Sequence, residues 1–290
     1  MTTPRIKNVS ASVRQRLLNY ARTSKRPFAE VLQYFAMERF LYRLSVSPHS
    51  ERFVLKGALL LSAWRASNSR PTMDIDLLGK MSNEVEAVLQ LMREVAQIEI
   101  PEDGIAFDPD SYSGETIRED ADYSGVRVTF KGNLAGAKLH MQIDVGFGDV
   151  VTPAPEELSY PTILEFPAPV LLGYSRETVI AEKLQALVQL RMLNSRMKDY
   201  YDLWLLSRHP ELDVATLRDA IQRTFRNRNT AIEAAPVGLS AEFCEDHGKQ
   251  AQWRAFLRRS NLIESPKSLV GVGEDLRQFF GPIIGDVADK

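Results

Sequence analysis

The chain has 290 residues, of which 44% are hydrophobic, and its formal net charge is −2. This length and composition are typical of a globular protein with one large domain or two modest ones. The nearly balanced charge excludes a polycation that coats nucleic acid indiscriminately, so any contact with RNA or DNA must use a local patch.

The sequence carries no targeting or spanning signal that we recognise. Its N-terminal residues lack the apolar stretch of a signal peptide, and no run approaches the roughly eighteen apolar residues of a membrane span. The single cysteine, Cys244, excludes an internal disulfide framework and fits a reducing compartment. We therefore expect a cytoplasmic protein that has no membrane partner.

The first part of the chain alternates helical and extended patterns. Residues 9–45 carry two amphipathic helical stripes, with Pro27 near the start of the second. A short strand is predicted at 53–55, where Lys56-Gly57 ends it, and a compact helix at 58–65. Residues 74–78 then read as a strand that enters a core.

The middle of the chain predicts a hairpin followed by an irregular crossing. Residues 126–130 and 138–145 flank a turn-rich segment at 131–136, which is typical of two antiparallel strands. The stretch 151–173 contains five prolines, so no regular element is expected there.

The rest of the chain reads as helical. Ser175 is the expected N-cap of a helix, and further helices are predicted from about 198 and over 213–226, 250–258 and 272–280.

We predict an α/β protein of the α+β type with three parts: a helical lead-in (1–50), a mixed-sheet core (51–150) and a helical C-terminal domain (151–290) that completes an active-site cleft.

Two aspartates one residue apart are the most informative feature. On a strand, Asp74 and Asp76 point to the same face, where two carboxylates repel each other unless a cation lies between them. Mg²⁺ with a phosphate-bearing substrate is the commonest arrangement. The alternative is that one aspartate caps a turn and the other is solvated. Asp144, which lies between β-branched residues, is a candidate third ligand or a hydrogen-bond acceptor for a turn.

Phosphoryl and nucleotidyl transfer also need a glycine turn, which lets backbone amides approach a phosphate, and a cation that neutralises the leaving pyrophosphate. Gly57 lies between a strand and a helix, and Lys183 lies on a helix that is otherwise apolar on one face. Lys183 could instead extend to solvent from a packed helix. Lys56 and Arg70 border the proposed site and could bind phosphate or be surface charges.

Four segments of the sequence resemble motifs of the AbiEii/AbiGii nucleotidyltransferase family. The similar segments, in order, are Phe53-Val54-Leu55-Lys56-Gly57-Ala58-Leu59-Leu60-Leu61, Arg70-Pro71-Thr72-Met73-Asp74-Ile75-Asp76-Leu77, Thr178-Val179-Ile180-Ala181-Glu182-Lys183-Leu184-Gln185-Ala186 and Arg196-Met197-Lys198-Asp199-Tyr200-Tyr201-Asp202-Leu203. The resemblance covers roughly residues 50–206, and it departs from the family pattern at Ala58 and Leu59.

The resemblance implies a DNA polymerase β-like core in which Asp74 and Asp76 bind Mg²⁺. It also makes Lys183 the phosphate-binding lysine and Asp202 an essential acid, with Asp199 beside it. Without the resemblance, Asp199 and Asp202 could form a solvated helix face or pair with Arg196.

The family comprises toxins of bacterial toxin–antitoxin systems, and relatives add nucleotides to the 3′ end of tRNA. The implied reaction is attack by an RNA 3′-hydroxyl on the α-phosphorus of a nucleoside triphosphate, and the implied protein partner is a cognate antitoxin. In some relatives the partner phosphorylates the position that matches Thr72, where a phosphate would repel the bound triphosphate.

A cluster of arginines is a candidate contact with the acceptor end of tRNA. Four arginines lie within eleven residues that contain a single acid, Asp219. The arginines are Arg218, Arg223, Arg226 and Arg228. The alternative is a solvated helix face.

Two other classes of function remain open from the sequence. A D-x-D glycosyltransferase would use the same carboxylates to hold a nucleotide sugar through a metal ion. A nucleotide-binding regulator would bind a triphosphate and a partner without releasing pyrophosphate.

Overall fold

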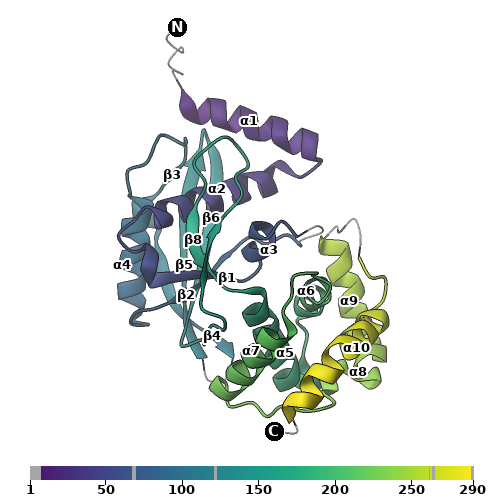
Figure 1. The fold of residues 1–290 in the computed structure, drawn as a ribbon. Coiled ribbons are helices and arrows are strands. Elements are labelled where there is room, and N and C mark those ends of the chain that lie inside the picture. Colours follow the sequence, from purple (N-terminus) through teal and green to yellow (C-terminus); the bar gives the residue numbers. More distant parts are fainter. Residues whose placement is uncertain (1–7, 67–69, 121–122, 261, 263–264, 289–290) are drawn as a thin grey trace. The chain divides into compact units, whose positions relative to one another are not determined.

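A computed structural model shows the fold of the chain and describes residues 8–66, 70–120, 123–260, 262 and 265–288. By its internal contacts the chain divides into two compact units. The first, unit 1, comprises residues 1–66, 72–148 and 157–173, and the second, unit 2, comprises 67–71, 149–156 and 174–290. Each unit is described separately below (Figure 1).

Unit 1 is built on a mixed sheet in the strand order β3-β5-β6-β2-β1-β8-β7, with β4 paired to β5. The strands are β1 (Phe53–Lys56), β2 (Ile75–Gly79), β3 (Ala106–Phe107), β4 (Ser113–Asp120), β5 (Tyr123–Leu134), β6 (Ala137–Phe147), β7 (Glu156–Ser159) and β8 (Val170–Gly173). Strand β2 runs antiparallel to β1 and parallel to β6.

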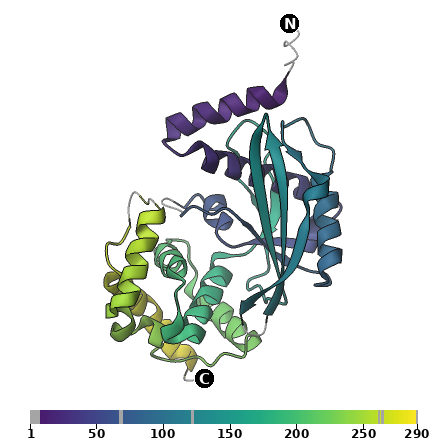
Figure 2. The same cartoon turned by 180° about the vertical axis from the view of Figure 1, so that it is seen from behind.

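The helices of unit 1 form its core with one face of the sheet. They are α1 (Val9–Ser24), α2 (Phe28–Ser45), α3 (Leu59–Ala63) and α4 (Val85–Ala96). Helix α2 packs against β6 and β8, α4 packs against β4 and β5, and α2 also contacts α1 and α4. Figure 2 shows α4 beside the long β5–β6 hairpin. Ile75 and Leu77 of β2 are completely buried, whereas Asp76 between them is partly exposed and points to the opposite face.

Unit 2 is helical. Its helices are α5 (Arg176–Leu190), α6 (Met197–Leu206), α7 (Val214–Asn227), α8 (Ala241–Glu245), α9 (His247–Ser260) and α10 (Leu269–Ala288). Helix α5 begins as predicted, because the hydroxyl of Ser175 accepts a hydrogen bond from the Thr178 amide. Helix α5 packs against α6 and α7, and α10 packs against α6, α7 and α8.

The α+β class predicted from the sequence is confirmed, with a mixed sheet and a mostly helical C-terminal part. One prediction was wrong. The proline-rich stretch 151–173 contains two strands, β7 and β8, which extend the sheet beyond β1. Pro153, Pro155, Pro161, Pro167 and Pro169 all lie outside those short strands, so they interrupt no ladder hydrogen bond.

Candidate active site

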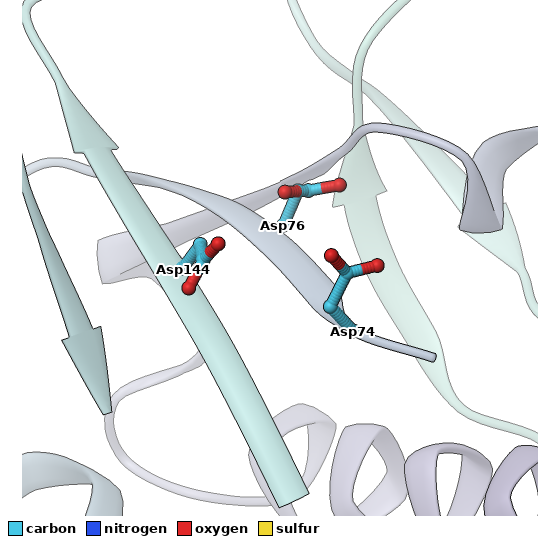
Figure 3. Close-up of side chains that lie close together, drawn as sticks. All are labelled: Asp74, Asp76 and Asp144. Atoms are coloured by element: carbon cyan, nitrogen blue, oxygen red, sulfur yellow. The ribbon is translucent and has the colours of Figure 1, made fainter. Parts of the chain in front are cut away.

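Three carboxylates converge on the face of the sheet opposite α2 (Figure 3). Asp76 lies in β2, Asp74 lies just before this strand, and Asp144 lies in β6 at the position paired with Asp76. One oxygen from each carboxylate lies within 4.8 Å of the others. Hard divalent cations such as Mg²⁺ prefer carboxylate oxygens, so this set fits such an ion. The structure thus brings together the three predicted metal ligands.

Gly57 follows β1 and has a φ of +73°, a conformation that residues with a side chain rarely adopt. A Cβ at this position would overlap with the carboxylate and the Cβ of Asp76. Only a glycine therefore lets the β1–α3 turn approach Asp76 this closely.

The residue before Gly57, Lys56, is buried and lies opposite Asp76 in the β1–β2 register. Lys56 is therefore no surface charge.

Asp144 has a cationic partner that the sequence did not identify. Arg127 of β5 donates from Nε to Asp144 Oδ1 at 2.8 Å and from Nη2 to Oδ2 at 2.7 Å. The hydrogen bonds with Asp144 raise the pKa of Arg127. Asp144 thus accepts hydrogen bonds from a charged neighbour and not from a turn. The only signal in the sequence was the alternating Val126-Arg127-Val128 pattern, which reveals the partner only once the hairpin register is known.

Two adjacent residues of α2 hold the segment before β2. The side-chain amide of Gln33 donates to the Met73 carbonyl at 3.1 Å and to the His140 carbonyl of β6 at 3.0 Å. The Tyr34 hydroxyl accepts a hydrogen bond of 3.0 Å from the Thr72 amide. Thr72 is buried, and its hydroxyl donates to Asp74. Neither α2 side chain could be identified from the sequence pattern, because both lie about 40 residues upstream of the segment that they hold.

The remaining predicted acids and cations meet in unit 2, in a buried ionic network. Lys183 of α5 lies 2.7 Å from Asp199 and 2.9 Å from Asp202, both of α6. Arg70 donates two hydrogen bonds of 2.9 Å to Asp202. Arg196 lies 2.5 Å from Asp199.

Charge attraction outweighs burial in this network. Burial by itself would raise the pKa of Asp199, but Lys183 and Arg196 hold it well below its usual range. Burial likewise opposes the charged form of Lys183, yet the two aspartates raise the pKa of its ammonium. Lys183 therefore does not extend to solvent, Arg70 is not a surface charge, and Asp199 and Asp202 do not form a solvated face.

The arginine cluster of α7 separates into different environments. Arg223 and Arg226 are exposed, and Arg223 pairs with Asp219 one turn away. Arg218 pairs with Asp286 of α10. Arg228 differs, because its side chain is only 9% exposed and bonds to Asp149 at 2.9 Å and to Gln185 at 3.0 Å. Arg228 thus joins the 149–156 segment to α5, and its assignment to an RNA contact stays a prediction.

Comparison with solved structures gives distant matches. JHP933 of Helicobacter pylori is 15% identical, with a TM-score of 0.46 over 87% of this chain and 88% of that one. A proposed nucleotidyltransferase from H. pylori is also 15% identical, with a TM-score of 0.44 over 87% and 91% of the two chains. No curated protein matches the sequence.

The acidic cluster on the mixed sheet could hold a metal ion. A family model described as the nucleotidyl transferase AbiEii toxin of type IV toxin–antitoxin systems matches residues 39–280. The chain therefore belongs to the AbiEii family of nucleotidyltransferase toxins. Among the described residues, no helix is long and apolar enough to cross a membrane.

Proposed function

We propose that the protein transfers nucleotides from a nucleoside triphosphate to the 3′ end of RNA, with the acceptor end of tRNA as its substrate and Mg²⁺ as its cofactor. The observation that carries this proposal is the convergence of Asp74, Asp76 and Asp144 beside the Gly57 turn. When bound there, the metal ion would supply charge stabilisation for the triphosphate and activation of the attacking hydroxyl. The 3′-hydroxyl oxygen of the RNA forms a bond to the α-phosphorus and releases its proton to solvent, while the bond from that phosphorus to the bridging oxygen breaks and pyrophosphate leaves.

The residues of the chain would divide the work. Asp74, Asp76 and Asp144 hold the metal, and the backbone at Gly57 with Lys56 faces the nucleotide. In the network of unit 2, three cations face two carboxylates, which leaves one positive charge. This excess suits contact with a triphosphate, so we assign Lys183, Arg70, Asp199 and Asp202 to nucleotide binding and catalysis.

The decisive test supplies total RNA, Mg²⁺ and each α-labelled triphosphate in turn. The wild-type protein should label one RNA class with one nucleotide. Asp76→Asn should abolish labelling with the circular dichroism spectrum unchanged, because it removes one ligand charge. Asp110→Asn, an exposed acid of the same unit, is the matched control. Retained labelling by Asp76→Asn, or turnover of sugar nucleotides in place of RNA labelling, would reject the proposal.

RNA contact is assigned to the exposed side of α7. Arg223 and Arg226 are exposed there, and Arg218 is partly exposed and pairs with Asp286. Replacing Arg223 and Arg226 with alanine should weaken RNA binding and reduce its dependence on salt concentration, while triphosphate binding stays intact. RNA affinity equal to that of the wild type would remove these residues from the interface.

Thr72 is proposed as the regulatory site through which a cognate antitoxin acts. Its hydroxyl donates to Asp74, so a phosphate there would remove that hydrogen bond and place about two negative charges beside a metal ligand. Protein coexpressed with its antitoxin should carry the phosphate, and mass spectrometry that finds only unmodified Thr72 would exclude this route.

A further inference from the structure

Four charged residues form one row across four neighbouring strands. Arg127 of β5 lies opposite Asp144 of β6, Asp144 lies beside Asp76 of β2, and Asp76 lies opposite Lys56 of β1. Residues paired in this way project from the same face of a sheet. We call Arg127, Asp144, Asp76 and Lys56 the charged row. It places a cation at each end and two carboxylates in the middle.

The charged row and Asp74 together hold two cations and three carboxylates, which leaves one negative charge at the site. Arg127 is the closest cation to Asp144, because it donates to both carboxylate oxygens at 2.7 and 2.8 Å. A free divalent ion that enters this site therefore meets a carboxylate already engaged by a guanidinium, and it is repelled by that guanidinium. A nucleoside triphosphate that arrives with the ion brings several negative charges, which offset this repulsion.

We propose that Arg127 is a resident counter-cation that lowers the affinity of the acidic site for free divalent metal and makes metal binding depend on an accompanying triphosphate. The inference rests on the proposed function, because it takes the acidic cluster as the metal site. It adds a residue whose charge controls the order in which metal and nucleotide bind. The protein would then keep little metal at its site when triphosphate is absent.

A purely structural role for Arg127 makes the opposite prediction. If the ion pair only fixes the orientation of Asp144, its loss should disorder a ligand and weaken metal binding, as removal of partners of metal ligands usually does. If Arg127 acts as a counter-cation, its loss should strengthen the binding of free metal. The sign of the change in metal affinity therefore separates the two roles without any measurement of catalysis.

The experiment measures binding of Mn²⁺ to the full chain by electron paramagnetic resonance, with and without a non-hydrolysable triphosphate. Arg127→Gln should bind free Mn²⁺ about tenfold more tightly than wild type, the size expected when one positive charge several ångströms from a divalent ion is removed. The same variant should bind the triphosphate with Mn²⁺ more weakly. Arg127→Lys keeps the charge and should stay close to wild type in free Mn²⁺ affinity. Lys131→Gln, an exposed cation on the same strand, is the matched control.

The outcomes separate this inference from the proposed function. Mn²⁺ binding that is lost in Asp76→Asn but equal or weaker in Arg127→Gln would overturn the role of Arg127 and leave the metal site standing. Absence of Asp76-dependent Mn²⁺ binding in every variant, with and without triphosphate, would overturn both. If Arg127→Gln does not fold, the wild-type protein still tests the inference, because its affinity for Mn²⁺ must increase when triphosphate is added. An unchanged affinity would reject the inference.

Discussion

The carboxylate of Asp76 packs directly against the α-carbon of Gly57, at a turn whose φ of +73° already disfavours a side chain. Gly57→Ala should therefore displace Asp76, because the added Cβ would overlap with both its carboxylate and its Cβ. Rotation of the Asp76 side chain alone does not relieve this overlap. We expect a loss of nucleotidyl transfer of about 10- to 100-fold, the scale of a disturbed metal site. Initial rates at saturating Mg²⁺ measure it.

A second glycine supplies the control for that variant. Gly136, in the β5–β6 turn, has a φ of +84°, but a Cβ there would meet nothing within 4 Å. Gly136→Ala should cost about 1–2 kcal/mol of folding free energy from backbone strain and leave activity unchanged. Equal activity losses in the two variants would show that strain, and not the contact with Asp76, is what matters at position 57.

Lys183 should contribute strongly to the stability of unit 2. Lys183→Met leaves the buried Asp199 paired with Arg196 and the buried Asp202 paired with Arg70. Removal of one member of a buried ionic network typically costs about 3–5 kcal/mol. Thermal unfolding should therefore show a clear decrease in Tm. Lys267→Met, which changes an exposed lysine of the same unit, should leave the Tm near that of the wild type. A Tm decrease of the same size in both would contradict the role of the network.

Tyr34 should position the Thr72–Asp74 segment through one hydrogen bond. Tyr34→Phe keeps the ring and removes the acceptor of the Thr72 amide, at a cost of about 1–3 kcal/mol for a buried group left unpaired. We expect a several-fold decrease in Mn²⁺ affinity as Asp74 loses its fixed position. Tyr42→Phe, on the same helix, is the matched control. Wild-type Mn²⁺ affinity in Tyr34→Phe would show that the segment is held by Gln33 alone.

Glu38 should make stability depend on pH. Burial raises the pKa of this α2 carboxyl to about 7, although Arg39 and the Ile163 amide favour the charged form, and Asp103 adds to the increase. Because the folded-state pKa lies above the unfolded value, the folded state binds more protons, and stability falls as pH rises from about 4.5 to 7. A shift of this size corresponds to a loss on the order of 3 kcal/mol over that window.

Chemical denaturation at pH 5 and pH 8 tests this dependence. Glu38→Gln removes the titrating group and should lose less stability between the two pH values than the wild type. Both proteins share every other titrating group, so the difference between them isolates Glu38. Parallel pH profiles for the two proteins would contradict the raised pKa.

Local sequence pattern was enough for the features that depend on near neighbours. Asp74 and Asp76 are two residues apart, Gly57 directly follows a predicted strand, and Ser175 caps its own helix, so each could be read from a few consecutive residues. The strands β7 and β8 were missed because each is only four residues long and adds to an existing sheet edge. The pairing partner that stabilises such short strands is far away in the sequence.

The sequence by itself therefore determined which residues are candidates for the chemistry, because an acidic pair, a glycine turn and helical periodicity are local properties of the chain. Only the tertiary structure decided what those residues contact. Asp144 meets Arg127 through the register of a long hairpin, and Arg228 is buried against Asp149, 79 residues away. The same holds for Lys183, which forms ion pairs with two aspartates of the next helix. Charge balance at a site is a sum over spatial neighbours, and strand register and helix packing choose those neighbours.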